Sequence, residues 1–312
     1  MKFRIDNYFE NLEKNILNNQ KSLDVNCNLK VFYGITDDGF LRLSFLSSIT
    51  APQIEGTKMI RIVQGKESDN VYWTCLDLLD NDFKKIFYSL CSDILNNISN
   101  LKDELEELNM IKDRISTWKI MFKKPKKPMN PETEQGLFGE LYFIDKYMID
   151  KYGIDEAIKS WSGPLKYNKD FSINTDWYEI KTPSVNSSSI KITSLSQLSS
   201  NNDGFLAIIR VEKMSQEFDD KSSSISDLIM KISTKITDLE IKQIFFNKLI
   251  DYGYDTDYSE KYNKFSVISA TIYEVTDKFP KLTEKDIKYQ EIDSVSYEIM
   301  IKPLERFKVN EL

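Results

Sequence analysis

An aspartate, a glutamate and a lysine stand close together in the stretch "DFSINTDWYEIKTP", which begins at Asp170 and includes Glu179 and Lys181. The pieces "DFSI" and "WYEIK" have the composition of short strands, and "NTD" between them is typical of a turn. Successive side chains of a strand point to opposite faces, so Glu179 and Lys181 share a face. Antiparallel pairing can bring Asp170 to that same face. The stretch therefore predicts two carboxylates and one ammonium converging on a hairpin.

These side chains match the needs of metal-assisted phosphodiester hydrolysis. Asp170 and Glu179 can hold Mg²⁺ against a phosphate, with the backbone carbonyl of Ile180 as a further oxygen ligand. The cation lowers the pKa of a bound water, and Lys181 can orient that water or neutralise transition-state charge. The chain contains no histidine, which excludes Ser-His-Asp and Cys-His catalysts and zinc sites built on imidazole. Oxygen ligands favour Mg²⁺ or Mn²⁺.

The same residues also allow a purely structural interpretation. An acid followed by Glu-x-Lys occurs by chance in many strands, and Lys181 would then only pair with Glu179 or Asp170. Surface ion pairs of that kind contribute little to stability. Asp176 is a rival metal ligand because it stands three residues before Glu179, but its place in the predicted turn favours a solvated acid.

Composition indicates a globular protein of about two domains. The chain has 312 residues, 41% of them hydrophobic and 29% charged, and no apolar run approaches a membrane span. The N-terminus lacks a signal-peptide core. Cys27, Cys75 and Cys91 have no ligand-like spacing, which predicts reduced thiols in a cytoplasm. The formal net charge of −7 means that a nucleic-acid substrate requires a local basic patch, a bound cation or a partner.

Residues 1–121 are expected to form an N-terminal region for recognition or docking. Residues 1–20 resemble a short amphipathic helix, and the alternating segments that follow, with a turn at Asp37-Asp38-Gly39, predict an antiparallel meander. From Asp82 to Trp118 apolar residues recur at threes and fours, as one or two long amphipathic helices require.

Residues 122–132, "FKKPKKPMNPE", mark a boundary because three prolines in so short a stretch exclude a helix interior or central strand. We interpret this segment as a linker. A minority interpretation is that its four lysines contact a phosphate backbone. These are Lys123, Lys124, Lys126 and Lys127.

Residues 133–215 form the predicted core. A helix over 132–150 carries Glu140 beside its apolar stripe, and the hairpin follows. Next come a polar loop, the short strand "IKIT", the helical turn "SLSQLSS" capped by Thr193 or Ser194, and the buried strand "GFLAIIRVEK". This order predicts an α/β (α+β) fold with a mixed sheet flanked by helices. Residues 216–312 add two helices and two strands, which we expect to pack on the core.

The region resembles the PD-(D/E)XK nuclease superfamily. The superfamily's motifs occur in order as "GLFGELYF", "KDF", "EIK" and a strand followed by "SLSQL". The resemblance implies a restriction-endonuclease-like core in which Asp170 and Glu179 bind the metal and Lys181 is the catalytic lysine. It also implies Glu140 as an auxiliary acid and Gln197 as a supporting polar residue.

Two neighbouring positions complete this comparison. Ser194, close to Gln197, is a further expected substrate contact. Lys169 precedes Asp170 where the superfamily's name has proline, a departure that many members share.

More narrowly, the chain is similar to bacterial PD-(D/E)XK motif proteins encoded near restriction-modification and phage-defence genes, through "WSGP", "EIKT" and "FPKL" as well. This similarity implies a Mg²⁺- or Mn²⁺-dependent, restriction-type endonuclease acting on DNA, with a co-encoded ATPase and methyltransferase as partners and no membrane association. The alternative is a catalytically silent DNA-binding or assembly subunit. Double-strand cleavage needs two active sites or two successive events, which is compatible with a homodimer.

Overall fold

The computed structural model describes residues 3–12, 19–119, 129–163, 169–200, 202–215 and 222–312. They fall into two compact units. Unit 1 comprises Met1–Lys124, Ile236–Ile250 and Asp255–Glu260, and unit 2 comprises Pro125–Lys235, Asp251–Tyr254 and Lys261–Leu312. In the described part of the chain, no helix is both long enough and apolar enough to span a bilayer.

Unit 1 contains a five-stranded antiparallel sheet in the order β1-β2-β3-β5-β4. Its strands are β1 (Asn19–Leu23), β2 (Lys30–Ile35), β3 (Leu41–Ser47), β4 (Ile60–Ser68) and β5 (Val71–Leu78). The sheet departs from a simple meander because β5 lies between β3 and β4, with Leu78 opposite both Leu41 and Ile60. The long connection between β3 and β4 leaves room for this order.

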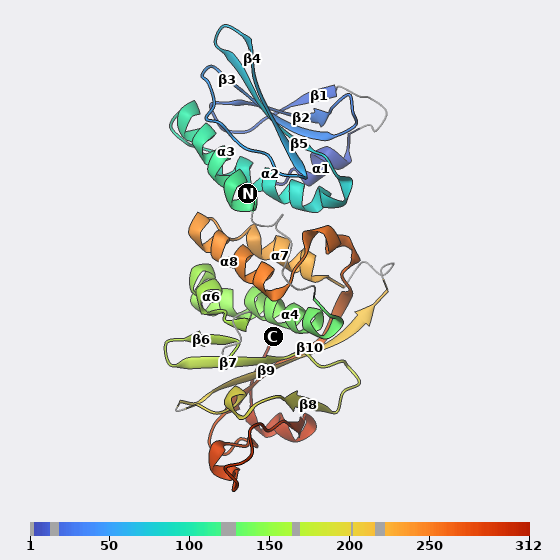
Figure 1. Ribbon diagram of the computed structural model, residues 1–312, viewed down its shortest axis with the longest axis vertical. Helices are drawn as coiled ribbons and strands as arrows, with labels where there is room; N and C mark the ends of the chain where they lie inside the picture. Colours follow the sequence, from blue (N-terminus) through green and yellow to red (C-terminus); the bar gives the residue numbers. More distant parts are fainter. Residues whose placement is uncertain (1–2, 13–18, 120–128, 164–168, 201, 216–221) are drawn as a thin grey trace. The chain divides into compact units, whose positions relative to one another are not determined.

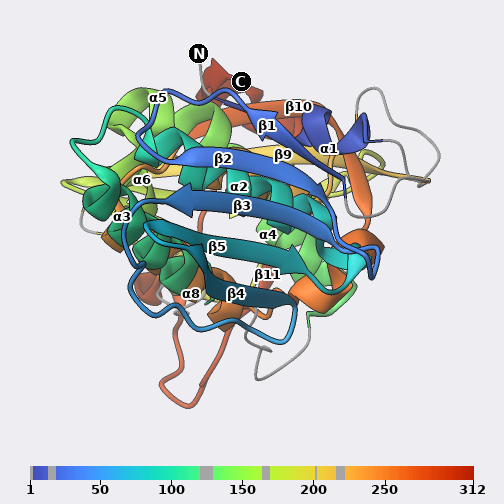
Figure 2. The same ribbon diagram turned by 90° about the horizontal axis from the view of Figure 1, so that it is seen from above.

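Two helices, α2 (Lys84–Ile98) and α3 (Glu104–Trp118), cover one face of this sheet (Figure 2). The predicted apolar stripe is therefore correct. It is divided where Asn100 has a φ of 68° and the Asp103 side chain caps α3 by accepting from the N–H of Glu106. The predicted helix over residues 1–20 is largely wrong. Only α1 (Asp6–Glu10) is helical among its described residues, and the segment already enters β1 at Asn19, where it pairs with β2.

A late segment of the chain also belongs to unit 1. Residues 236–250 include most of α8 (Leu239–Tyr252). The fully buried Lys242 lies 2.6 Å from Asp93, and the rings of Phe246 and Trp118 are 5.0 Å apart. Residues 216–312 therefore do not all extend the core as expected.

Unit 2 is built on a mixed sheet in the order β12-β10-β9-β7-β6. Its strands are β6 (Phe171–Ile173), β7 (Asp176–Lys181), β9 (Gly204–Met214), β10 (Lys264–Val275) and β12 (Lys308–Glu311). The β7–β9 pair is parallel and the other pairs are antiparallel. This arrangement confirms the predicted α+β class with a mixed sheet.

Helices α4 (Pro131–Phe143) and α6 (Ile154–Ser160) lie on one side of this sheet (Figure 1). A π-helical segment, Ile144–Met148, joins α4 to α5 (Ile149–Tyr152), and α7 (Ile225–Ser233) packs on α4. Pro131, expected in the linker, is instead at the start of α4, where its missing N–H costs no hydrogen bond.

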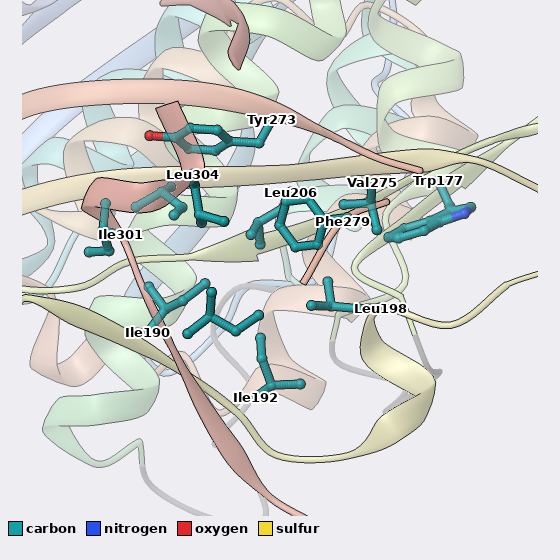
Figure 3. Packing of buried hydrophobic residues seen from close by; sticks show 12 residues of the cluster. Trp177, Ile190, Ile192, Leu198, Leu206, Tyr273, Val275, Phe279, Ile301 and Leu304 are labelled. Carbon is teal, nitrogen blue, oxygen red and sulfur yellow. The ribbon is translucent and has the colours of Figure 1, made fainter. Parts of the chain in front are cut away.

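The other side of the sheet packs against the small sheet of β8 (Ser189–Ile192) and β11 (Tyr297–Met300). Twelve buried side chains form the apolar cluster between these layers (Figure 3). They are Trp177, Ile190, Ile192, Leu198, Leu206, Ile208, Tyr273, Val275, Phe279, Ile299, Ile301 and Leu304. Burial of this surface anchors β8 and the 3₁₀ turn η5 (Leu195–Gln197) beneath the sheet.

Candidate active site

The β6–β7 hairpin brings the predicted acids and lysine together. Asp170 directly precedes β6, and its Oδ2 accepts a hydrogen bond of 2.7 Å from the backbone N–H of Ile180 in β7. Glu179 and Lys181 flank Ile180, and Lys181 Nζ lies 2.8 Å from Glu179 Oε1. The carboxylate of Asp170 is thus held beside both residues, as the alternation of strand side chains predicts.

Burial and repulsion perturb the two carboxylates. Burial, together with the negative charge of Asp170, raises the pKa of Glu179 to about 8, against the opposing effects of Lys181 and Lys169. Burial also raises the pKa of Asp170, although the N–H of Ile180 and the charge of Lys181 act to lower it. The hairpin therefore places two acids side by side where solvation is poor, and a bound cation would stabilise their charged forms.

Glu140 reaches this cluster from α4, where its side chain is buried. Its Oε2 accepts a hydrogen bond of 2.6 Å from the indole N–H of Trp161, and its Oε1 accepts one of 2.5 Å from the hydroxyl of Tyr252. Burial and the charge of Asp170 raise the pKa of Glu140 well above its usual range. A Cβ on Gly163 would lie 2.1 Å from Oε2, so Trp161 and Gly163 enclose this acid.

The helix that carries Glu140 packs closely on the end of β7. A Cβ on Gly139 would lie 1.9 Å from Thr182 Oγ1, and Gln135 Nε2 donates a 2.7 Å hydrogen bond to the carbonyl of Thr182. Because Thr182 directly follows Lys181, these two contacts with Thr182 fix the position of α4 relative to Lys181. The motif "GLFGELYF" thus contributes a close-approach glycine as well as its acid.

Gln197 meets Lys181 from η5. Lys181 Nζ donates to Gln197 Oε1 at 3.1 Å, and the backbone N–H of Thr193 donates to the same oxygen at 2.8 Å. Ser194 occupies the cap position of this turn, one of the two residues predicted for it, but its side chain makes no capping hydrogen bond. Its hydroxyl instead contacts that of Ser196 at 2.9 Å, and its role as a substrate contact stays a prediction.

Asp176 does not belong to the cluster. It begins β7, and its Oδ2 accepts a 2.7 Å hydrogen bond from the hydroxyl of Tyr152 and lies 3.4 Å from Lys151 Nζ. The four lysines of the predicted linker, Lys123, Lys124, Lys126 and Lys127, lie outside the described residues.

The sequence pattern missed two contributors. Tyr252 is 112 positions from Glu140, and no local signal connects the two residues. The sequence marks Lys169 only as a replacement of proline, yet its ammonium donates to the carbonyls of Ser196 and Gln197 at 2.8 and 2.7 Å. No feature of the sequence indicates the burial of Lys169, because a lysine beside a strand is ordinarily solvated.

The donor set suits a hard divalent cation. Among the described residues, no hydrogen bond reaches Asp170 Oδ1 or Glu179 Oε2, so each carboxylate keeps an oxygen for a ligand bond. The same residues contain no group of three His, Cys, Asp or Glu side chains arranged to hold a metal ion. A cation here would therefore depend on two carboxylates and on carbonyl or water oxygens such as that of Ile180, as expected for Mg²⁺ or Mn²⁺.

Comparison with known proteins agrees with this geometry. No curated protein and no solved structure matches the chain. A family model described as "Putative PD-(D/E)XK family member, (DUF4420)" matches residues 5–302. Because that match covers nearly the whole chain, including the hairpin, α4 and η5, the protein belongs to this PD-(D/E)XK family.

Proposed function

We propose that the protein is a Mg²⁺- or Mn²⁺-dependent endodeoxyribonuclease that hydrolyses DNA phosphodiester bonds. The observation that carries this proposal is the convergence of Asp170, Glu179 and Lys181 on one hairpin, with Glu140 beside them. A surface ion pair would not need Asp170 and Glu179 to lie close together in a poorly solvated place, whereas binding a cation between them does.

Each residue of the cluster has a distinct task in this mechanism. When bound, the cation polarises the phosphoryl oxygen and lowers the pKa of a water. Asp170 and Glu179 hold it, and the hydrogen bond from Ile180 fixes the orientation of Asp170. Lys181, whose side chain is 16% exposed, can reach a phosphate and neutralise the charge that develops as the bond to the leaving oxygen breaks.

Glu140 serves as the auxiliary acid. Trp161 and Tyr252 occupy both of its oxygens, so its carboxyl group stays in place when substrate arrives. Gln197 supports Lys181 by accepting a hydrogen bond from its ammonium. Held groups of this kind need no reorganisation during the reaction.

The biological setting that we propose is a restriction or anti-phage system in the cytoplasm. The net charge of −7 opposes binding to DNA, so a cation, the lysines at 123–127 or a basic partner must offset the repulsion. A co-encoded ATPase or methyltransferase could supply that partner, and a homodimer could supply the second active site for double-strand cleavage.

Cleavage of plasmid and linear DNA with Mg²⁺ or Mn²⁺ tests the proposal. Lys181→Ala should reduce the rate on the order of 10²–10³-fold while leaving metal binding nearly intact, whereas Asp170→Ala should lose both. Asp176→Asn is the matched control, because it changes an acid at the other end of β7 and should leave cleavage unchanged. Equal cleavage by wild type and Lys181→Ala would refute the catalytic role.

A silent DNA-binding or assembly subunit is the competing proposal. It is favoured by the Lys181–Glu179 ion pair, which partly neutralises the site without a metal. Calorimetric titration with Mn²⁺ separates the two proposals, because a silent subunit has no need to bind the cation at Asp170 and Glu179. Absence of cleavage with all partners supplied, together with absence of metal binding, would favour the silent subunit.

A further inference from the structure

Lys169 lies in an unusual position for a lysine. Its side chain is 9% exposed, and its ammonium lies 3.6 Å from the centre of the Trp177 ring. Among the described residues it forms no ion pair. Its hydrogen-bond partners are two backbone carbonyls, those of Ser196 and Gln197. Burying an ammonium costs free energy, so these contacts must compensate for the lost hydration.

Both carbonyls belong to the end of η5, and this turn is otherwise weakly held. Ile192 and Leu198, on either side of it, are anchored in the apolar cluster (Figure 3). Between them, the backbone contact from Gln197 N–H to the carbonyl of Ser194 is 3.3 Å long. The cap residue Ser194 makes no capping hydrogen bond, and its hydroxyl contacts that of Ser196 instead. Lys169 therefore fixes the peptide groups from which the Gln197 side chain projects.

The Gln197 side chain passes this constraint on to the site. Its Oε1 accepts from Lys181 Nζ at 3.1 Å and from the N–H of Thr193 at 2.8 Å. Lys181 in turn lies 2.8 Å from Glu179. A continuous series of contacts thus runs from Lys169 through η5 and Gln197 to Lys181.

We propose that Lys169 is a positioning residue that holds η5, and through Gln197 sets the place of the Lys181 ammonium. A proline at this position could not donate to η5. In this chain, the lysine supplies a support that the motif as usually written lacks. The catalytic consequence rests on the proposed nuclease function, but the positioning itself does not.

Two readouts test the proposal on the full chain. The first is hydrogen exchange, by NMR, of the Thr193 amide, whose partner is Gln197 Oε1. Lys169→Met keeps the length of the side chain and its contact with Trp177 but removes the donors. We expect Thr193 to exchange at least about tenfold faster, with the amides of β9 unchanged. Gln197→Leu should have the same effect.

The second readout is DNA cleavage. Lys169→Met should lower kcat about tenfold, as loss of one hydrogen-bonded support would, and leave KM within about threefold. The double variant Lys169→Met/Gln197→Leu should be no slower than Gln197→Leu alone, because both changes act through one contact. Lys169→Arg, which keeps the charge and the donors, should recover part of the rate.

The outcomes are distinguishable. Unchanged Thr193 exchange in a folded Lys169→Met variant would overturn the proposal, and so would additive losses in the double variant. If wild type does not cleave DNA, the nuclease function fails, yet Thr193 exchange still decides the positioning role. If Lys169→Met does not fold, Lys169→Gln replaces it, and its shorter neutral amide should give the same faster exchange.

Discussion

The indole N–H of Trp161 donates to Glu140 Oε2 at 2.6 Å and connects the acid of α4 to the C-terminal end of α6. The Trp161 ring also stacks on Tyr252, with centroids 6.2 Å apart, and Tyr252 occupies the other oxygen of the same carboxyl group. Both aromatic residues therefore serve as donors and as packing partners. Because both oxygens of Glu140 accept hydrogen bonds from the protein, its carboxyl group keeps its orientation without hydrogen bonds from water.

We predict that Gly163→Ala disturbs this acid. The new Cβ would lie 2.1 Å from Glu140 Oε2 and 3.0 Å from the Trp161 indole nitrogen, so the carboxyl group must move. We expect a loss of about 1–3 kcal/mol in stability, typical of overpacking, and slower cleavage. Thermal unfolding and a cleavage assay measure the two effects. Gly65→Ala is the control, because its Cβ would meet no atom within 4 Å, and an equal loss there would count against the steric explanation.

The acidic cluster predicts how stability depends on pH. The folded-state pKa of Glu179 is about 8, above the ordinary value of 4.5, and the pKa values of Asp170 and Glu140 are raised as well. Folding therefore favours the protonated forms. The stability from Glu179 is fully present below its ordinary pKa of 4.5 and is lost as pH rises toward about 8, and the raised pKa values of Asp170 and Glu140 act in the same direction. Glu179→Gln should flatten this dependence.

Divalent cations should restore the stability that is lost as the pH rises. Mn²⁺ or Mg²⁺ binds the charged carboxylates and stabilises the folded state by mass action. We expect the rise in Tm on adding Mn²⁺ to be larger at pH 8 than at pH 6, because protons compete with the metal. Scanning fluorimetry against EDTA measures it. Asp176→Asn should keep the full rise, whereas a rise that persists in Asp170→Ala would place the bound metal elsewhere.

We predict that Gly139 and Thr182 are energetically coupled. Gly139→Ala should cost about 1–3 kcal/mol, since its Cβ would lie 1.9 Å from Thr182 Oγ1. Thr182→Ala removes that hydroxyl but leaves a Cβ at 3.0 Å, so the double variant should recover part of the loss. Urea unfolding of the four proteins gives the coupling energy. Strictly additive losses would show that α4 can shift away from β7 freely.

The packing of residues 236–250 in unit 1 can be tested separately. Asp93 is buried beside Lys242 at 2.6 Å and Arg114 at 3.5 Å, so Asp93→Ala should cost about 3–5 kcal/mol by removing the carboxylate that two buried cations share. Asp6→Ala, which breaks the exposed pair with Arg4, should cost less than about 1 kcal/mol. Urea unfolding compares them, and similar costs would argue against a buried network.

The local parts of the site could be predicted from the sequence. Alternation along a strand and turn-forming residues place Asp170, Glu179 and Lys181 together, because a tight hairpin fixes register within a few residues. The absence of histidine narrows the chemistry to oxygen-bound cations. The spacing of apolar residues likewise predicts the helices α2 and α3 and the strands β9 and β10, because each of these elements buries several apolar side chains.

Only the tertiary structure decided which distant surfaces meet. Three features depend on contacts between segments that are far apart in the chain. They are the hydrogen bond from Tyr252 to Glu140, the hydrogen bonds from Lys169 to η5 and the packing of residues 236–250 in unit 1. The position of β5 between β3 and β4 is of the same kind. A hydrophobic pattern specifies which face of a helix or strand is buried. Which other element packs against that face depends on the shape and charge of both complete surfaces, and a short stretch of sequence does not specify these.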